Sequence, residues 1–115
     1  MAFLFEKLSV YQKAVDVAEK ISRLTDSFPK GNYYLSDQLN RASLSISANL
    51  AEGNGRFHKN DRKQFFWIAR GSVQECVPLL EIAKRKNLIP EQEHLKIKEE
   101  LEVIAKMISG LVNSI

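Results

Sequence analysis

Residues Gln38–Arg56, QLNRASLSISANLAEGNGR, contain most of one predicted helix and the signal that ends it. Serine and alanine fill much of this stretch, while its larger apolar residues recur at the spacing of a single helix face. These larger residues are Leu39, Ile46 and Leu50. Gly53 and Gly55 are expected to end the helix, because glycine adopts the left-handed conformation of a helix terminus at little cost. The stretch predicts a helix and indicates no chemical activity.

Three further helices are predicted on either side of this stretch, over residues 10–27, 61–86 and from residue 90 onwards. Each has apolar residues at intervals of three and four, the pattern of a helix with one buried face. Pro90 is expected at the first position of the last helix, and Pro78 is expected to kink the helix before it. Gly71 is unfavourable inside a helix, so another backbone is expected to approach it closely. The predicted N-caps are Ser9 for the first helix, Ser36 for the second and Asn60 for the third.

The last two helices carry the strongest packing signals. The apolar surface of residues 61–86 is broad enough to need more than one neighbour, within the bundle or in another subunit. In the last helix, apolar residues alternate in spacing between four and three, which predicts near-parallel packing against neighbouring helices. They are Ile97, Leu101, Ile104, Ile108, Leu111 and Ile115. Because no segment has the alternation of a strand, we predict a single all-α domain over residues 1–115, an antiparallel up-down-up-down four-helix bundle.

The composition of the 115 residues is typical of a globular protein, with 44% apolar and 27% charged residues. The formal net charge of +3 is compatible with a nucleic acid or an acidic partner, and is too small to distinguish them. Cys76 is the only cysteine, which excludes an intramolecular disulfide and is typical of a reducing compartment. The apolar run near residue 4 is too short for a signal sequence or a membrane span. We therefore expect a cytoplasmic protein that does not associate with a membrane.

Six polar residues on the second and third helices are predicted to form a structural network, namely Arg41, Asn49, Glu52, Arg70, Ser72 and Glu75. If these helices form a hairpin that turns near residue 57, Glu52 lies opposite Arg62. Further from the turn, Arg41 lies opposite Glu75. The Glu75 carboxylate shares its face with apolar residues, so it is expected to be partly buried and to need Arg41 or Arg70 as a partner. The group would either fix the register of the helices, which we favour, or supply a general acid or base with a shifted pKa.

The sequence contains no convincing catalytic or metal-binding pattern. His58 and His94 stand alone, without partners at the spacing of a metal site. The string Gly53–Gly55 follows a helix, whereas phosphate-binding glycine loops follow a strand. Cys76 lies on an apolar face, where its thiolate is disfavoured. We therefore expect a protein that is not an enzyme, with no catalytic residue, cofactor or metal.

Basic residues gather at the predicted turn between the second and third helices. The candidate contacts to a nucleic-acid backbone are Arg56, Lys59, Arg62 and Lys63. Phe57 lies among them, and an aromatic side chain beside basic ones suits contacts to both phosphates and bases. The alternative is an ordinary solvated helix end, and the residues alone favour neither interpretation. A second basic group, residues 84–86, lies at the opposite end of the predicted bundle.

Four segments stand in a recognisable order along the chain: VYQKAVDVA, LTDSFPK, QLNRASLSISANLAEGNGR and FFWIARGSVQE. Together they resemble a family of small bacterial four-helix bundles that are encoded in intervening sequences of 23S rRNA genes and are often labelled ribosomal proteins. The resemblance covers nearly the whole chain, and its most specific parts are Ser45–Arg56 and Ile68–Glu75. Two positions depart from the family, Asn40, where a second arginine is frequent, and Pro78.

The resemblance implies an antiparallel bundle, frequently assembled as a ring-shaped homopentamer, with no catalytic residues. The biochemical function of most members is not established. A related branch comprises accessory proteins of diversity-generating retroelements, which bind a reverse transcriptase and nucleic acid through basic surfaces. Two hypotheses follow for this chain. It is either an oligomeric module that binds structured RNA or DNA by phosphate contacts, or a scaffold for another polypeptide such as a polymerase or reverse transcriptase.

Overall fold

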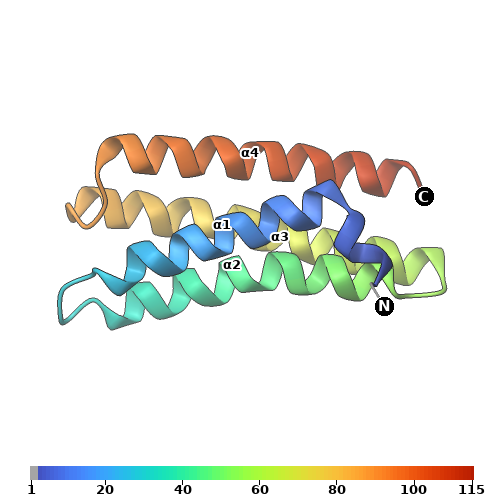
Figure 1. The fold of residues 1–115 in the computed structure, drawn as a ribbon, viewed down its shortest axis with the longest axis horizontal. Helices are drawn as coiled ribbons and strands as arrows, with labels where there is room; N and C mark the ends of the chain where they lie inside the picture. Colours follow the sequence, from blue (N-terminus) through green and yellow to red (C-terminus); the bar gives the residue numbers. More distant parts are fainter. Residues whose placement is uncertain (1–2) are drawn as a thin grey trace.

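The computed structural model describes residues 3–115, which form four long helices preceded by a short 3₁₀ turn (Figure 1). The elements are η1 (Leu4–Lys7), α1 (Ser9–Asp26), α2 (Tyr33–Asn54), α3 (Lys59–Arg85) and α4 (Glu91–Asn113). Successive helices run in opposite directions, and the described residues contain no strand. The predicted all-α antiparallel four-helix bundle is therefore confirmed. Within the same residues, no helix is long and apolar enough to cross a membrane.

The bundle is elongated, so that its two ends are separate surfaces. It extends 44 Å along its longest axis and 26 and 20 Å along the others. The turn between α2 and α3 lies at the same end as η1 and the C-terminus, whereas the α1–α2 and α3–α4 connections lie at the other end (Figure 1). The α2–α3 turn is therefore separated from the other two connections by the length of the bundle.

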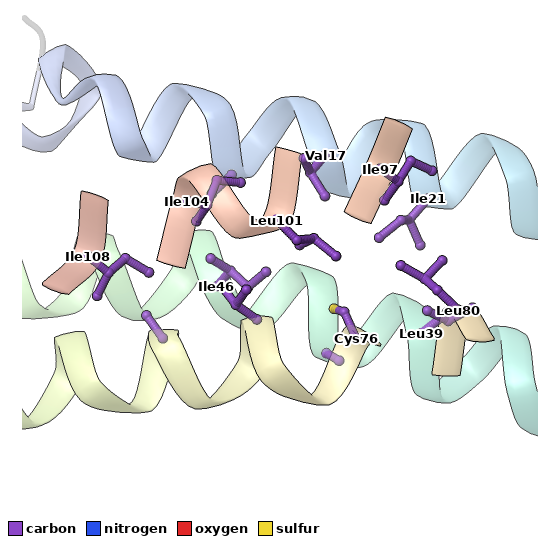
Figure 2. Close-up of a cluster of buried hydrophobic side chains, with 14 of the residues drawn as sticks. Val17, Ile21, Leu39, Ile46, Cys76, Leu80, Ile97, Leu101, Ile104 and Ile108 are labelled. Carbon is purple, nitrogen blue, oxygen red and sulfur yellow. The ribbon is translucent and has the colours of Figure 1, made fainter. Parts of the chain in front are cut away.

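The core is built from apolar side chains of all four helices (Figure 2). Ile97, Leu101, Ile104 and Ile108 of α4 are buried, as the spacing of four and three predicted. At the end of this helix Val112 is buried, while Leu111 packs only partly against the core. Burial of a large apolar side chain stabilises the fold by about 1.5–3 kcal/mol, so this seam is a main source of stability.

The broad apolar surface of α3 divides between two sides of the helix. Phe66, Val73 and Leu80 point into the core and are buried. Trp67 and Ile68 are exposed, because the neighbouring helices α2 and α4 cover only the inward side. The bundle itself therefore leaves part of the predicted apolar stripe uncovered.

All three predicted N-caps are wrong, because each helix begins earlier than expected. Ser9 is already the first residue of α1, and only Leu8 separates this helix from η1. Ser36 lies inside α2, where its backbone N–H and that of Leu35 both donate to the Asn32 carbonyl at 3.1 Å. Asn60 is the second residue of α3, and Pro90 is the N-cap of α4, one position before the one predicted. The residues found at the other three N-caps are Leu8, Asn32 and His58.

The helix of the opening stretch ends at its glycines, as predicted, but without the predicted left-handed conformation. Gly53 lies within α2, and Gly55 caps it with φ −83°, so neither adopts the left-handed conformation. Gly53 is buried, and a Cβ there would lie 2.8 Å from Phe66 Cε1 and 3.0 Å from Phe65 Cβ. Glycine at this position allows α2 and α3 to approach closely.

Gly71, in the interior of α3, also differs from expectation. A Cβ at Gly71 would meet no atom within 4 Å, so the predicted close approach of another backbone is wrong. Gly71 lies on the exposed side of the helix. Helix α3 continues through Pro78 without a break, while the kink expected there stays a prediction.

Candidate nucleic-acid interface

Two residues of the predicted polar network meet at one serine in the α2–α3 hairpin. Asn49 Nδ2 donates to the Ser45 carbonyl at 2.8 Å and lies 2.9 Å from Ser45 Oγ. Ser72 Oγ of α3 also lies 2.9 Å from Ser45 Oγ. These contacts satisfy polar groups near the core and define which residues of the two helices face each other. The chemistry is structural, since no charged group takes part.

The charged members of the predicted network do not join this cluster. Glu75 is exposed, so its predicted burial is wrong, and among residues 3–115 neither it nor Arg41 has an ion-pair partner within 4.0 Å. Arg70 instead donates from Nε to Ser109 Oγ of α4 at 2.9 Å. The reason is helix geometry: Glu75 is seven residues from both Ile68 and Ile82, which are exposed, so all three share the outward side of α3.

The candidate contacts Arg56, Lys59, Arg62 and Lys63, here called the basic turn, lie where α2 ends and α3 begins. Arg56 is held against the protein, with Nη2 3.8 Å from a Glu52 carboxylate oxygen and its guanidinium carbon 4.6 Å from the centre of the Phe65 ring. The predicted Glu52–Arg62 pair is therefore replaced by a pair within one helix turn. Lys59 is exposed, while Arg62 and Lys63 are half-buried.

Arg62 has an unusual environment for an arginine. Its Nε is buried without a hydrogen-bond partner, the only such side-chain nitrogen or oxygen among residues 3–115. A buried donor without a partner lowers stability by about 1–3 kcal/mol.

The second basic group, at the opposite end, is engaged by contacts within the protein. Glu81 lies 2.9 Å from Arg85 Nε and 3.7 Å from Lys84 Nζ. The hydrogen bond from Arg85 is the main cause that lowers the pKa of the Glu81 carboxyl, with smaller contributions from Lys84, Arg85 and His94 charges. Lys86 Nζ donates to Asn32 Oδ1 at 2.6 Å and to the Tyr34 hydroxyl at 2.9 Å. These cations are less available to a partner than those of the basic turn.

The groups considered for catalysis are not assembled into a site. Cys76 is buried, and burial together with the nearby Glu75 charge raises the pKa of its thiol to about 12. His58 is exposed beside the basic turn, while His94 is buried on α4 with Nε2 3.6 Å from a Glu81 oxygen. In residues 3–115, no group of three or more histidine, cysteine or acidic side chains is placed to hold a metal ion.

Comparison with known proteins agrees with the fold. The sequence profile described as 23S rRNA-intervening sequence protein matches residues 6–110. The chain belongs to this family. A crystal structure from Bacteroides thetaiotaomicron VPI-5482, described as a protein with unknown function from the S23 ribosomal protein family, has the same fold: the TM-score is 0.83 at 23% sequence identity, over 90% of this chain and 97% of that chain. No curated protein sequence matches the chain significantly.

The basic turn lies within the region that matches the 23S rRNA-intervening sequence protein family. In this family member, Asn40 has a structural contact, since its Nδ2 donates to Thr25 Oγ1 of α1 at 2.9 Å. Neither this contact nor the Glu81–His94 contact between α3 and α4 is visible in the sequence. Both join residues far apart in the sequence, so no local pattern could have predicted them.

Proposed function

We propose that the protein binds structured nucleic acid through the basic turn and acts by binding, without catalysis. One observation carries the proposal: among residues 3–115, Lys59, Arg62 and Lys63 have no acidic partner within 4.0 Å. Residues 56–63 contain four cationic side chains and one carboxylate. Their net charge therefore equals the formal net charge of +3 of the whole chain. Closely spaced free cations at one end of an elongated molecule favour contact with a phosphate backbone.

The end of α3 strengthens this interpretation. The first backbone N–H groups of a helix have no partner within it, and the helix dipole places partial positive charge there. Lys59 is the first residue of α3, so its ammonium group and these N–H groups lie at the same end of the bundle. Asp61 in the first turn offsets part of the charge. The net arrangement still favours an anion such as a phosphate.

Reversing two charges of the basic turn tests the proposal. We expect Arg62→Glu with Lys63→Glu to weaken binding of a hairpin RNA by about 100-fold at low salt, because two phosphate contacts become repulsive. Fluorescence anisotropy with a labelled hairpin measures the affinity. The slope of log affinity against log salt concentration should become shallower in the variant, by the amount that corresponds to the loss of about two phosphate contacts.

A matched control changes the same net charge elsewhere. Lys30 lies in the α1–α2 connection and Lys96 near the start of α4, both exposed at the end opposite the basic turn. The affinity of the variant Lys30→Glu with Lys96→Glu for the hairpin should be within about threefold of that of the unmodified protein. Its two changed charges lie far from the basic turn and are screened by salt. If both double variants weaken binding equally, the basic turn is not the interface. Absence of binding to any RNA or DNA at low salt would end the proposal.

A second observation favours a protein–protein interface on the outer side of the α2–α3 hairpin. Leu44 is 60% exposed, and Ile68 and Ile82 are 46% and 44% exposed. Arg41 and Glu75 are exposed on the same two helices. We propose that copies of the chain associate through this surface, as the family resemblance implies for a homopentamer. Apolar side chains would be covered there, and the two free charges could pair between subunits.

Light scattering tests this association. We expect the unmodified protein to have a mass several times the 13.1 kDa of the chain. The variant Leu44→Glu with Ile68→Glu should be monomeric, because it places charges in an apolar contact. An unmodified protein that is a monomer would overturn self-association. Another polypeptide, such as a polymerase, would then be the better candidate for this surface.

A further inference from the structure

We infer that the nucleic acid bound by the basic turn contains unpaired nucleotides, and that Phe57 stacks on one of their bases. The inference rests on the proposed function and specifies its substrate class. Phe57 is 91% exposed, more than any other large apolar side chain among residues 3–115. An aromatic ring so fully in contact with water is stabilised when a flat apolar partner covers it.

The position of Phe57 explains why no part of the protein covers it. It lies in the short connection between Asn54, the last residue of α2, and Lys59, the first residue of α3. The buried position nearby is occupied by Phe66, and the Phe65 ring is in contact with the Arg56 guanidinium. The ring of Phe57 is therefore left at the tip of the hairpin.

One contact orients this ring without covering it. The Phe57 and His58 rings lie edge to face, with centres 5.2 Å apart and an angle of 87° between their planes. Edge-to-face pairs are a favoured aromatic geometry, so His58 limits the orientations of the neighbouring ring. With 91% of Phe57 still exposed, most of its surface remains open to a partner.

The charges around Phe57 indicate the chemistry of that partner. Arg56 precedes it by one residue, Lys59 follows by two, and Lys63 lies one helix turn further along α3. Cations on both sides of an exposed aromatic ring suit a single strand, whose phosphates and base faces are both accessible. Within a duplex the base faces are hidden in the stack, so Phe57 would have no surface to cover except at the two ends. Unpaired loops and bulges therefore fit this surface better than a continuous double helix.

Two RNA probes with the same number of phosphates separate base stacking from charge. One is a hairpin with an unpaired loop, and the other is a blunt, fully paired duplex. We expect the protein to bind the loop probe about tenfold more tightly than the duplex, the ratio that stacking of one base on an aromatic ring supports. Phe57→Leu should remove this preference and leave duplex affinity and its salt dependence unchanged, because leucine keeps the apolar character and loses the flat ring.

A second substitution keeps the measurement informative. Phe57→Trp should retain the preference for the loop probe. When Trp67→Phe is added, the tryptophan at position 57 is the only one in the printed sequence, and its fluorescence should be quenched by the loop probe and unchanged by the duplex. Thermal unfolding of each variant checks the fold, which an exposed position should not alter.

The outcomes distinguish this inference from the function on which it rests. Equal binding of the two probes, unaffected by Phe57→Leu, would overturn the stacking inference and leave binding by the basic turn intact. Binding of neither probe would overturn both. Phe57-dependent binding to phosphatidylserine vesicles, without binding to either RNA, would also overturn both and assign the turn to a membrane surface.

Discussion

Gly53→Val is expected to lower the free energy of unfolding by about 3 kcal/mol, because the α2–α3 interface has no room for a side chain there. The first added carbon would lie 2.8 Å from Phe66 Cε1, and the Phe66 ring is fully buried and cannot move aside freely. Valine adds two further methyl groups, so either the ring or the helix must shift. Urea denaturation monitored by circular dichroism measures the change, which should appear at the midpoint with the slope retained.

The same substitution at Gly71 provides the matched control. A Cβ there meets no atom within 4 Å, so Gly71→Val should change stability by less than about 0.5 kcal/mol, and Gly71→Ala should raise it by about 1 kcal/mol through helix propensity. Combining Gly53→Val with Phe66→Leu should destabilise less than the sum of the two single changes, since the smaller side chain vacates space beside residue 53. Equal effects of valine at positions 53 and 71 would contradict the close approach of the two helices.

Cys76 is expected to make the protein less stable at alkaline pH. Burial raises the pKa of its thiol from 9.0 to about 12 in the folded state, and the Glu75 charge adds to this effect. Between these values the unfolded chain releases the thiol proton while the folded protein retains it, so the unfolded state binds fewer protons. The free energy of unfolding therefore falls by about 1.4 kcal/mol per pH unit over this range, or about 2 kcal/mol by pH 10.5.

Comparison with Cys76→Ala isolates this contribution from lysine and tyrosine titration. The unfolding free energy of both proteins is measured by urea denaturation at about pH 8 and about pH 10.5, and the unmodified protein should lose about 2 kcal/mol more than the variant. Alkylation of Cys76 by iodoacetamide at about pH 8 should also be roughly 1,000-fold slower in the folded protein than in urea, since the thiolate fraction falls by that factor. An identical alkaline loss in the alanine variant would contradict the buried, protonated thiol.

Much of the bundle follows from local sequence patterns. The spacing of Ile97, Leu101, Ile104 and Ile108 predicts the buried side of α4, because a helix places residues three and four apart on one side. The breaks between helices follow from turn-forming residues, although helix starts were misplaced by one to several positions. The basic turn is likewise visible as a run of cations between two helical patterns.

What each polar residue contacts was decided by tertiary structure. Glu75 shares its helix face with apolar residues, which predicts its burial, and the hairpin arrangement predicts Arg41 opposite it. The Ser45–Ser72 contact and the approach of Phe66 to Gly53 set a different alignment of α2 and α3. Glu75 then lies on the outward side. A small rotation or shift of a helix exchanges buried and exposed positions, so pairing across helices cannot be obtained from spacing alone.

Periodicity and charge are local properties, so the four antiparallel helices and the basic residues at both ends can be predicted from the sequence. Which of these cations remain free depends on how the helices pack. At one end Glu81, Asn32 and Tyr34 contact the basic residues, whereas Lys59 and Lys63 in the basic turn have no acidic partner among residues 3–115. The same packing made Gly53 a site of close helix approach and left Phe57 exposed at the tip. These differences depend on distances between segments remote in the chain, which only the folded bundle sets.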